Sequence, residues 1–148
     1  MKLISHRGNL NGSMFLLENT PKYIDIALKK FDCEVDVWFL NGQFFLSHDE
    51  PKTKMPTPID FFLERKNKLW IHCKNLEALS EFKKYKKQFN YFFHSIDQYT
   101  ITSKGFIWAN IEVPYNKDCI IVEDGLKKIG EVGGICSDNI EYYARKTV

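Results

Sequence analysis

The stretch CEVDVWFL, Cys33–Leu40, is rich in β-branched and aromatic residues and predicts a strand. Successive side chains of a strand point to opposite faces, so Glu34 and Asp36 share one face. The apolar side chains at positions 33, 35, 37 and 39 occupy the other. Asn41-Gly42 then gives a strong tight-turn signal, and residues 43–47 return as a second strand. The pattern is typical of a central strand with one charged face.

Similar signals continue on both sides of this hairpin. Residues 3–6, LISH, predict a short buried strand. Thr20-Pro21 predicts the start of a helix, because threonine can cap free N–H groups and proline suits the first helical position. Further strands are expected at 69–73, 91–93, 106–109, 120–122 and 134–136, and further helices after Thr57-Pro58, after Asn75, at 123–129 and at 139–145.

About seven strands alternating with helices predict an α/β fold with a parallel sheet. The 148 residues are expected to form a single domain, 1–148. An α/β barrel typically takes about 250 residues, so a barrel of this length would have to replace helices by loops, notably after residues 94 and 109. Length alone favours an open doubly wound sheet.

Composition excludes several classes of protein. The net charge is only +2, from 21 basic and 19 acidic residues, which argues against a nucleic-acid-binding surface but not against a small phosphate-bearing substrate. No apolar run approaches a membrane span, and the N-terminus does not have the pattern of a signal peptide. The cysteines form no C-x-x-C pair, so they are expected to be buried reduced thiols of a cytoplasmic protein: Cys33, Cys73, Cys119 and Cys136.

His6-Arg7-Gly8 directly follows the first predicted strand. Ligands of parallel α/β folds bind at the carboxyl ends of the strands. Histidine titrates near neutral pH, and arginine can bind two phosphate oxygens at once. Glycine lets the backbone come close to a ligand. The alternative is a surface turn with an incidental histidine.

The carboxylates of Glu34 and Asp36 are expected to converge in the interior of the fold. Two such groups repel and desolvate each other unless positive charge lies between them, so a hard divalent cation is expected, and Glu18 could supply a further oxygen. An outward, solvated pair is the alternative, and it suits a central strand poorly. His48-Asp49, after the returning strand, completes the set.

These motifs, in this order and spacing, resemble the glycerophosphodiester phosphodiesterase family. The resemblance rests on residues 1–50, with a weaker continuation at 69–74 and at 135–138, through these segments: His6-Arg7-Gly8, Glu18-Asn19-Thr20, Glu34-x-Asp36-Val37, Phe45-Leu46-Ser47-His48-Asp49, Leu69-x-Ile71-x-Cys73-Lys74 and Ile135-Cys136-Ser137-Asp138. It implies a compact TIM-type (β/α) barrel with several helices shortened or missing, in place of the open sheet.

The resemblance also implies a reaction, the metal-dependent hydrolysis of a small phosphodiester. His6 and His48 resemble the family's general acid and base. Arg7 and Lys74 would neutralise the substrate phosphate. The metal, Mg²⁺ or Ca²⁺, would be held by the three carboxylates Glu18, Glu34 and Asp36.

The chain departs from the family at His72, where a glutamate is common. An imidazole ligand would favour Mn²⁺ or Zn²⁺, and equally His72 could be no ligand at all. The chain is also about 100 residues shorter than a typical barrel. Its substrate-binding loops are therefore expected to be reduced or supplied by another subunit. In the second case the protein would be a homo-oligomer.

Four more residues are candidates for the pocket. His94 and Asp97 follow another strand, where they could contact substrate or cap a loop that replaces a helix. Trp38 shares the face of Asp36 and could wall the pocket or pack in the core, and Trp108 follows on a later strand. The alternative to an enzyme is a phosphate-ligand binding module that kept the barrel and lost turnover; retention of both His6 and His48 speaks against it.

Overall fold

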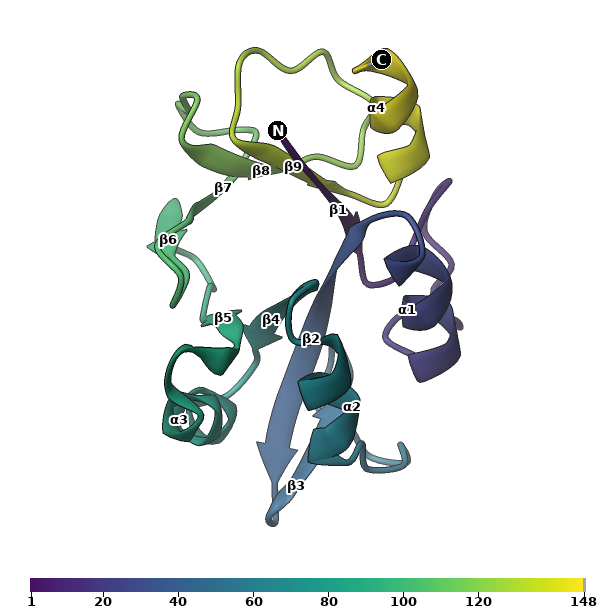
Figure 1. The fold of residues 1–148 in the computed structure, drawn as a ribbon, viewed down its shortest axis with the longest axis vertical. Coiled ribbons are helices and arrows are strands. Elements are labelled where there is room, and N and C mark those ends of the chain that lie inside the picture. The colour runs from purple at the N-terminus through teal and green to yellow at the C-terminus, as the bar shows by residue number, and fades with distance from the viewer. Residues whose placement is uncertain (148) are drawn as a thin grey trace.

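The computed structural model describes residues 1–147, which form a nearly closed, barrel-shaped sheet with helices on its outside (Figure 1). The strand order around the barrel is β5-β4-β2-β1-β9-β8-β7-β6, and β3 pairs with β2 as a hairpin. The strands are β1 (Lys2–His6), β2 (Asp32–Leu40), β3 (Gln43–Leu46), β4 (Leu69–Cys73), β5 (Asn90–Phe92), β6 (Tyr99–Ile101), β7 (Ile107–Asn110), β8 (Cys119–Val122) and β9 (Gly134–Ser137).

Neighbouring strands around the barrel are parallel, except that β6 runs antiparallel to β7. Strand β6 was missed from the sequence, because three residues with exposed Tyr99 and Ile101 carry no burial pattern. Ser103, just after β6, reaches β5: its N–H donates to Tyr91 O at 2.8 Å, and its Oγ accepts from Tyr91 N–H at 2.9 Å. These bonds bring the two ends of the sheet together, and the expected α/β barrel-like fold is confirmed.

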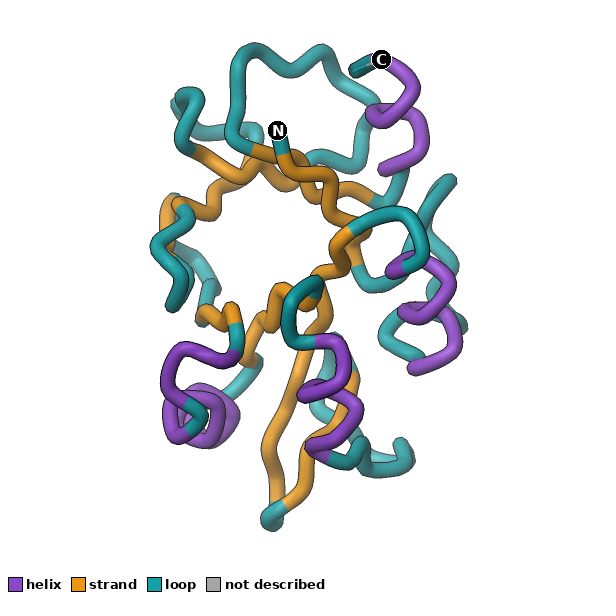
Figure 2. Tube along the Cα trace, viewed as in Figure 1, coloured by secondary structure: helices purple, strands orange, loops and turns teal. Residues whose placement is uncertain are grey.

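The helices are α1 (Pro21–Leu28), α2 (Ile59–Arg65), α3 (Leu76–Lys84) and α4 (Ile140–Lys146), with a 3-10 turn at Lys86–Gln88. They gather around β1, β2, β4 and β9, whereas loops connect the strands from β5 to β9 (Figure 2). Asn75 caps α3 by accepting from Ala78 N–H, as expected. Thr20 does not cap α1; its hydroxyl donates to Leu17 O instead. None of the helices within residues 1–147 has the length and apolar character that crossing a membrane requires.

The helix expected at 123–129 is wrong, since the structure has a loop there. Glu123 folds its carboxylate back onto the N–H of Gly125, and Leu126 has a left-handed backbone with φ of 59°. A side chain that bonds to nearby backbone competes with helix formation, and a left-handed residue interrupts it.

Strand alternation separates two layers of packing. The outward apolar side chains of β2 and β4 pack against the helices, in one core that includes Val35, Ile71, Ile24, Phe62 and Phe82. The inward side chains fill the barrel as a second core: Ile4, Trp70, Phe92, Trp108, Ile120 and Cys136. Trp108 therefore packs in the interior core. All four cysteines are buried and free, as expected.

Candidate active site at the carboxyl ends of the strands

The sheet register brings charged residues together above the apolar interior. His6, the last residue of β1, pairs with Glu34 of β2, and Asp36 of β2 pairs with His72 of β4. Two residues before each of these histidines, Ile4 on β1 and Trp70 on β4 belong to the apolar core. His6 and His72 thus lie at the carboxyl ends of β1 and β4, and Glu34 and Asp36 lie beside them in the first half of β2. Together they form a polar layer resting on an apolar one.

His6 lies between carboxylates from both halves of the chain. Its Nδ1 is 2.9 Å from Asp138 Oδ1 and 3.5 Å from Asp124 Oδ2, and its Nε2 is 3.8 Å from Glu34 Oε2. Asp138 also accepts from Asn9 Nδ2 at 2.7 Å. A carboxylate on Nδ1 fixes the ring and leaves Nε2 facing the site.

Glu34 lies between the two imidazoles, with its Oε1 3.6 Å from His72 Nδ1. Asp36 Oδ1 is 3.2 Å from the same nitrogen. The other ring nitrogen of His72, Nε2, lies 2.9 Å from the carbonyl oxygen of His94. Because a carbonyl only accepts, Nε2 carries a proton, and Nδ1 is the nitrogen that His72 presents to the carboxylates.

Asp36 is completely buried and surrounded by basic groups. Arg7 Nε lies 2.9 Å from its Oδ2, an ion pair whose angle does not make a hydrogen bond, and Lys74 Nζ lies 3.6 Å from its Oδ1. Asn19 fixes the carboxylate further by donating its Nδ2 to Oδ2 at 3.0 Å and accepting the Asp36 N–H at 3.0 Å. Both phosphate-binding candidates therefore reach the same carboxylate.

Glu18 takes a different place from the expected one. Its carboxylate accepts from Arg7 NH1 at 3.3 Å, from Asn9 Nδ2 at 2.9 Å and from Ser13 Oγ. The groups of acidic and imidazole side chains that could hold an ion within residues 1–147 do not include it. Glu18 orients Arg7 here.

Burial and the neighbouring carboxylates shift the titration of both site histidines. Burial alone would lower the pKa of His6, but Asp124, Asp138 and Glu34 outweigh it and raise that pKa to about 10. His72 behaves in the same way, with Asp36 and Glu34 raising its pKa to about 9 against the effect of burial. Both imidazoles are therefore protonated on both ring nitrogens and positively charged at neutral pH.

The acidic residues shift in the opposite direction. Burial would raise the pKa of Asp36, but His72, Arg7 and Lys74 hold it well below its usual range. The pKa of Asp124 is likewise lowered, because His6 outweighs the effect of burial.

Within residues 1–147, two groups of side chains could hold a metal ion: Glu34 with Asp36 and His72, and His6 with Asp124 and Asp138. In the first group, Glu34 Oε2 and Asp36 Oδ1 are buried and have no hydrogen-bond partner. Such oxygens are costly in a protein interior and are the donors that a hard divalent cation prefers. The first group therefore fits a cation.

The second group fits a hydrogen-bond network better. Asp138 already bonds to His6 and Asn9, and Asp124 accepts the N–H of Asp138 at 2.7 Å. The carboxylate oxygens of Asp124 and Asp138 are therefore engaged in orienting His6.

His48 stands apart from these groups on the exposed segment after β3, with its side chain 49% exposed. Its Nδ1 is 2.9 Å from Asp49 Oδ1, which leaves Nε2 free. It lines a cavity of about 300 Å³ together with Glu18 and Asn19. Those two residues contact Arg7 and Asp36, so the cavity of His48 adjoins the charged site.

The remaining candidates lie around the site in different ways. His94 accepts at its carbonyl from His72 and bonds through its Nε2 to Asp97 O, so this segment holds His72 in place. The side chain of Asp97 is exposed to solvent. Trp38 is partly buried with an indole N–H that has no partner.

Sequence reasoning did not select Asp124, Asp138, Asn9 or Asn19. Ser137-Asp138 and Val122-Glu123-Asp124 both place an acid directly after an apolar strand, the same signal that drew attention to His6. That signal was available, but only the closed order of the strands shows that β8 and β9 deliver their acids to β1.

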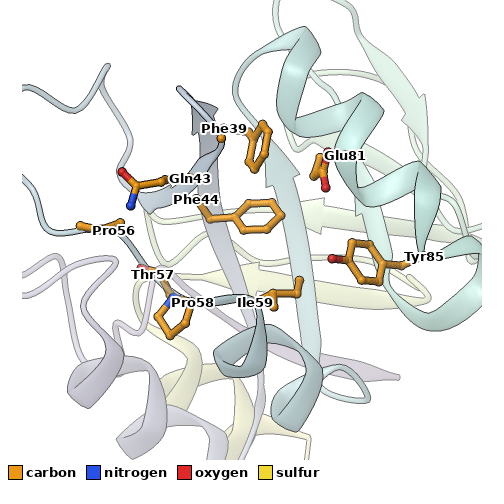
Figure 3. A pocket seen from close by; sticks show the side chains of 10 residues that line it. Phe39, Gln43, Phe44, Pro56, Thr57, Pro58, Ile59, Glu81 and Tyr85 are labelled. Atoms are coloured by element: carbon orange, nitrogen blue, oxygen red, sulfur yellow. The ribbon is translucent and has the colours of Figure 1, made fainter.

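A separate cleft of about 390 Å³ lies outside the barrel, where the β2–β3 hairpin meets α2 and α3 (Figure 3). Phe39, Phe44, Pro58, Ile59 and Tyr85 give it apolar walls, with Glu81 at one side. It contains none of the residues of the charged site.

No family model, curated protein or solved structure significantly matches the chain.

Proposed function

We propose that the chain is a metal-dependent phosphodiester hydrolase of the glycerophosphodiester phosphodiesterase type. The observation that carries the proposal is the pair of buried carboxylate oxygens without hydrogen-bond partners, Glu34 Oε2 and Asp36 Oδ1. They lie among basic side chains beside the carboxyl ends of β1 and β4, and α/β barrels bind ligands at the carboxyl ends of their strands. We include in the proposal that the barrel is a reduced TIM-type barrel, since all its strands except β6 share one direction around the sheet.

Glu34, Asp36 and Nδ1 of His72 would hold a divalent metal ion. When bound, the ion supplies positive charge for the phosphate oxygens in place of the proton on His72. Arg7 and Lys74 add charge from the chain itself, and Glu18 keeps the Arg7 guanidinium in place. The carboxylates thus hold the basic groups that a phosphate dianion or diester would meet.

His6 is suited to be the general acid. Asp138 holds its Nδ1, so Nε2 is the nitrogen that would give its proton to the leaving alkoxide. A pKa of about 10 keeps that proton in place at neutral pH until charge develops on the leaving oxygen. A cation beside Glu34 would oppose part of that upward shift and make the proton easier to transfer.

His48 would be the general base. Asp49 on its Nδ1 leaves Nε2 to accept a proton from the attacking water, as the new P–O bond forms and the bond to the leaving group breaks. The shared position of His48 and Glu18 in one cavity supports this assignment.

Hydrolysis of bis(4-nitrophenyl) phosphate, a soluble diester, tests the proposal with Mg²⁺, Mn²⁺, Ca²⁺ and Zn²⁺ in turn. Metal-dependent release of nitrophenol that is lost in His6→Ala and in His48→Ala supports it. If the protein binds Mg²⁺ and inorganic phosphate by calorimetry but turns over neither this diester nor glycerophosphodiesters, the non-catalytic binding module is correct. Full turnover in a chelator by metal-free protein would refute the metal site.

A further inference from the structure

The loop between β1 and α1 presents consecutive large apolar side chains to solvent. Met14 is 52% exposed, Phe15 80%, Leu16 88% and Leu17 43%. We call residues 14–17 the apolar tip. In Figure 1 the purple segment that carries it runs along the edge of the molecule beside α1. Contiguous exposed apolar surface of this kind usually marks an interaction site.

The apolar tip is held in its conformation by the candidate active site. Leu17 N–H and Glu18 N–H both donate to Met14 O, at 2.7 and 3.0 Å, and close a tight turn. Met14 N–H donates to Asn9 Oδ1 at 3.1 Å, and Asn9 in turn binds Glu18. The exposure is therefore a fixed feature of the fold, and it does not come from a loose chain.

The tip also forms part of the wall of the cavity that contains His48. Phe15 and Leu16 line that cavity together with Glu18, His48 and Lys54. Met55, which follows Lys54 in the sequence, is 83% exposed and lines the neighbouring cavity, which shares Lys54 with this one. A ligand in this cavity would therefore lie against the apolar side chains of the tip.

The geometry points to a phospholipid bilayer as the occupant, and we propose that the protein docks on zwitterionic membrane surfaces through residues 14–17. A protruding tip with two nearly bare side chains needs a matching hollow in a protein partner, whereas acyl chains adapt to it. The neighbouring charged side chains suit zwitterionic headgroups, since Asp49 and Glu50 balance Lys52 and Lys54. Docking on anionic lipid would call for a basic excess beside the apolar surface.

Docking in this position would give the cavity of His48 a membrane-resident phosphodiester as its substrate. This last step rests on the proposed function, whereas docking itself does not. The two can therefore be tested by separate measurements on the full chain.

The test is cosedimentation with sucrose-loaded phosphatidylcholine vesicles, in Mg²⁺ and in chelator. We expect the protein to bind in both, and moderate salt to leave binding unchanged. Phe15→Ser with Leu16→Ser should weaken the partition coefficient about 100-fold, because burial of each side chain is worth roughly a factor of ten or more. Ile101→Ser is the matched control, since Ile101 is 69% exposed on β6 away from the tip, and this variant should bind as the parent does.

Several results would overturn the docking proposal. These are absence of binding to phosphatidylcholine, equal binding by the double variant, or binding that needs anionic lipid and disappears with salt. A dimer in sedimentation equilibrium that Phe15→Ser with Leu16→Ser abolishes would make a second copy of the chain the occupant instead. If the double variant does not fold, Phe15→Trp with brominated phosphatidylcholine decides: its fluorescence is quenched only where the tip enters the acyl region. Vesicle binding by a protein that hydrolyses neither the soluble diester nor glycerophosphodiesters would refute the proposed function and leave docking intact.

Discussion

Raising the pH should destabilise the metal-free protein through His6 and His72. Folding raises the pKa of His6 from 6.5 to about 10 and that of His72 from 6.5 to about 9. A group with a raised folded pKa contributes its full stabilisation below the unfolded pKa and loses it as the pH rises through the folded one. The window of loss is therefore about pH 6.5 to 10, and the sign is a falling free energy of unfolding.

The size of the effect follows from the shifts. One pKa unit corresponds to about 1.4 kcal/mol, so between pH 6.5 and about 8.5 each histidine loses roughly 2 kcal/mol of stabilisation. Both rings are largely buried, with side chains 14% and 17% exposed, so solvent screens these interactions little. Because the two histidines share Glu34, their effects overlap, and a combined loss of about 2–4 kcal/mol is expected.

Urea denaturation in chelator at pH 6.5, 7.5 and 8.5 measures this loss. With a urea m-value of about 2 kcal/mol/M, the midpoint should fall by roughly 1–2 M across the series. His6→Gln should be less stable at pH 6.5 and show about half the slope. Ser103→Ala, which removes hydrogen bonds to backbone groups of Tyr91 and Phe89 only, should keep the full slope. A midpoint that stays constant or rises with pH would mean that neither imidazole holds its proton through the carboxylates.

Further substitutions test the metal site and the barrel closure. Asp36→Asn should abolish Mg²⁺ binding in calorimetry and cost about 3–5 kcal/mol of metal-free stability, because it leaves buried basic groups without their partner; Mg²⁺ affinity within twofold of the parent would contradict this. His72→Glu should tighten Mg²⁺ binding at least about 10-fold relative to Mn²⁺, since it exchanges a nitrogen for a hard oxygen donor; an unchanged metal ranking in a folded variant would show that His72 is no ligand. Ser103→Ala removes the two hydroxyl bonds and should lower the free energy of unfolding by about 1–2 kcal/mol, and exposed Ser95→Ala should not; equal stabilities would show that the Ser103 hydroxyl does not help to close the sheet.

The sequence could predict what strand periodicity and local order determine. Alternation along Cys33–Leu40 put Glu34 and Asp36 on one face, and the structure has both buried on the inner side of β2. His72 and Lys74, two residues apart in the sequence, follow the same rule, and both lie within 4 Å of Asp36. These relations are confirmed because a strand's pleat leaves no other arrangement.

Relations across the chain could not be read in this way. The acids that hold His6 come from β8 and β9, more than a hundred residues away, and reach it only because β9 pairs with β1. The chain length favoured an open sheet on the assumption that every connection between strands contains a helix. In the structure, loops replace helices between β5 and β9. Glu18 was assigned from its place in a motif, and its contacts depend on how the loop turns back onto Arg7 and Asn9.

In the polar layer, the stability of the fold and the proposed chemistry depend on the same balance between buried carboxylates and basic groups. Glu34 and Asp36 come from a single strand, but the groups that neutralise them come from β1, β4 and the segments that follow. A partly formed barrel would leave the two carboxylates buried and unpaired, so the layer favours complete assembly over partial folding. In the metal-free protein, protons on His6 and His72 supply much of the positive charge. A divalent cation and the proton on His72 would therefore compete for the same carboxylates, and the cation would gain affinity over the pH range in which the metal-free fold loses stability.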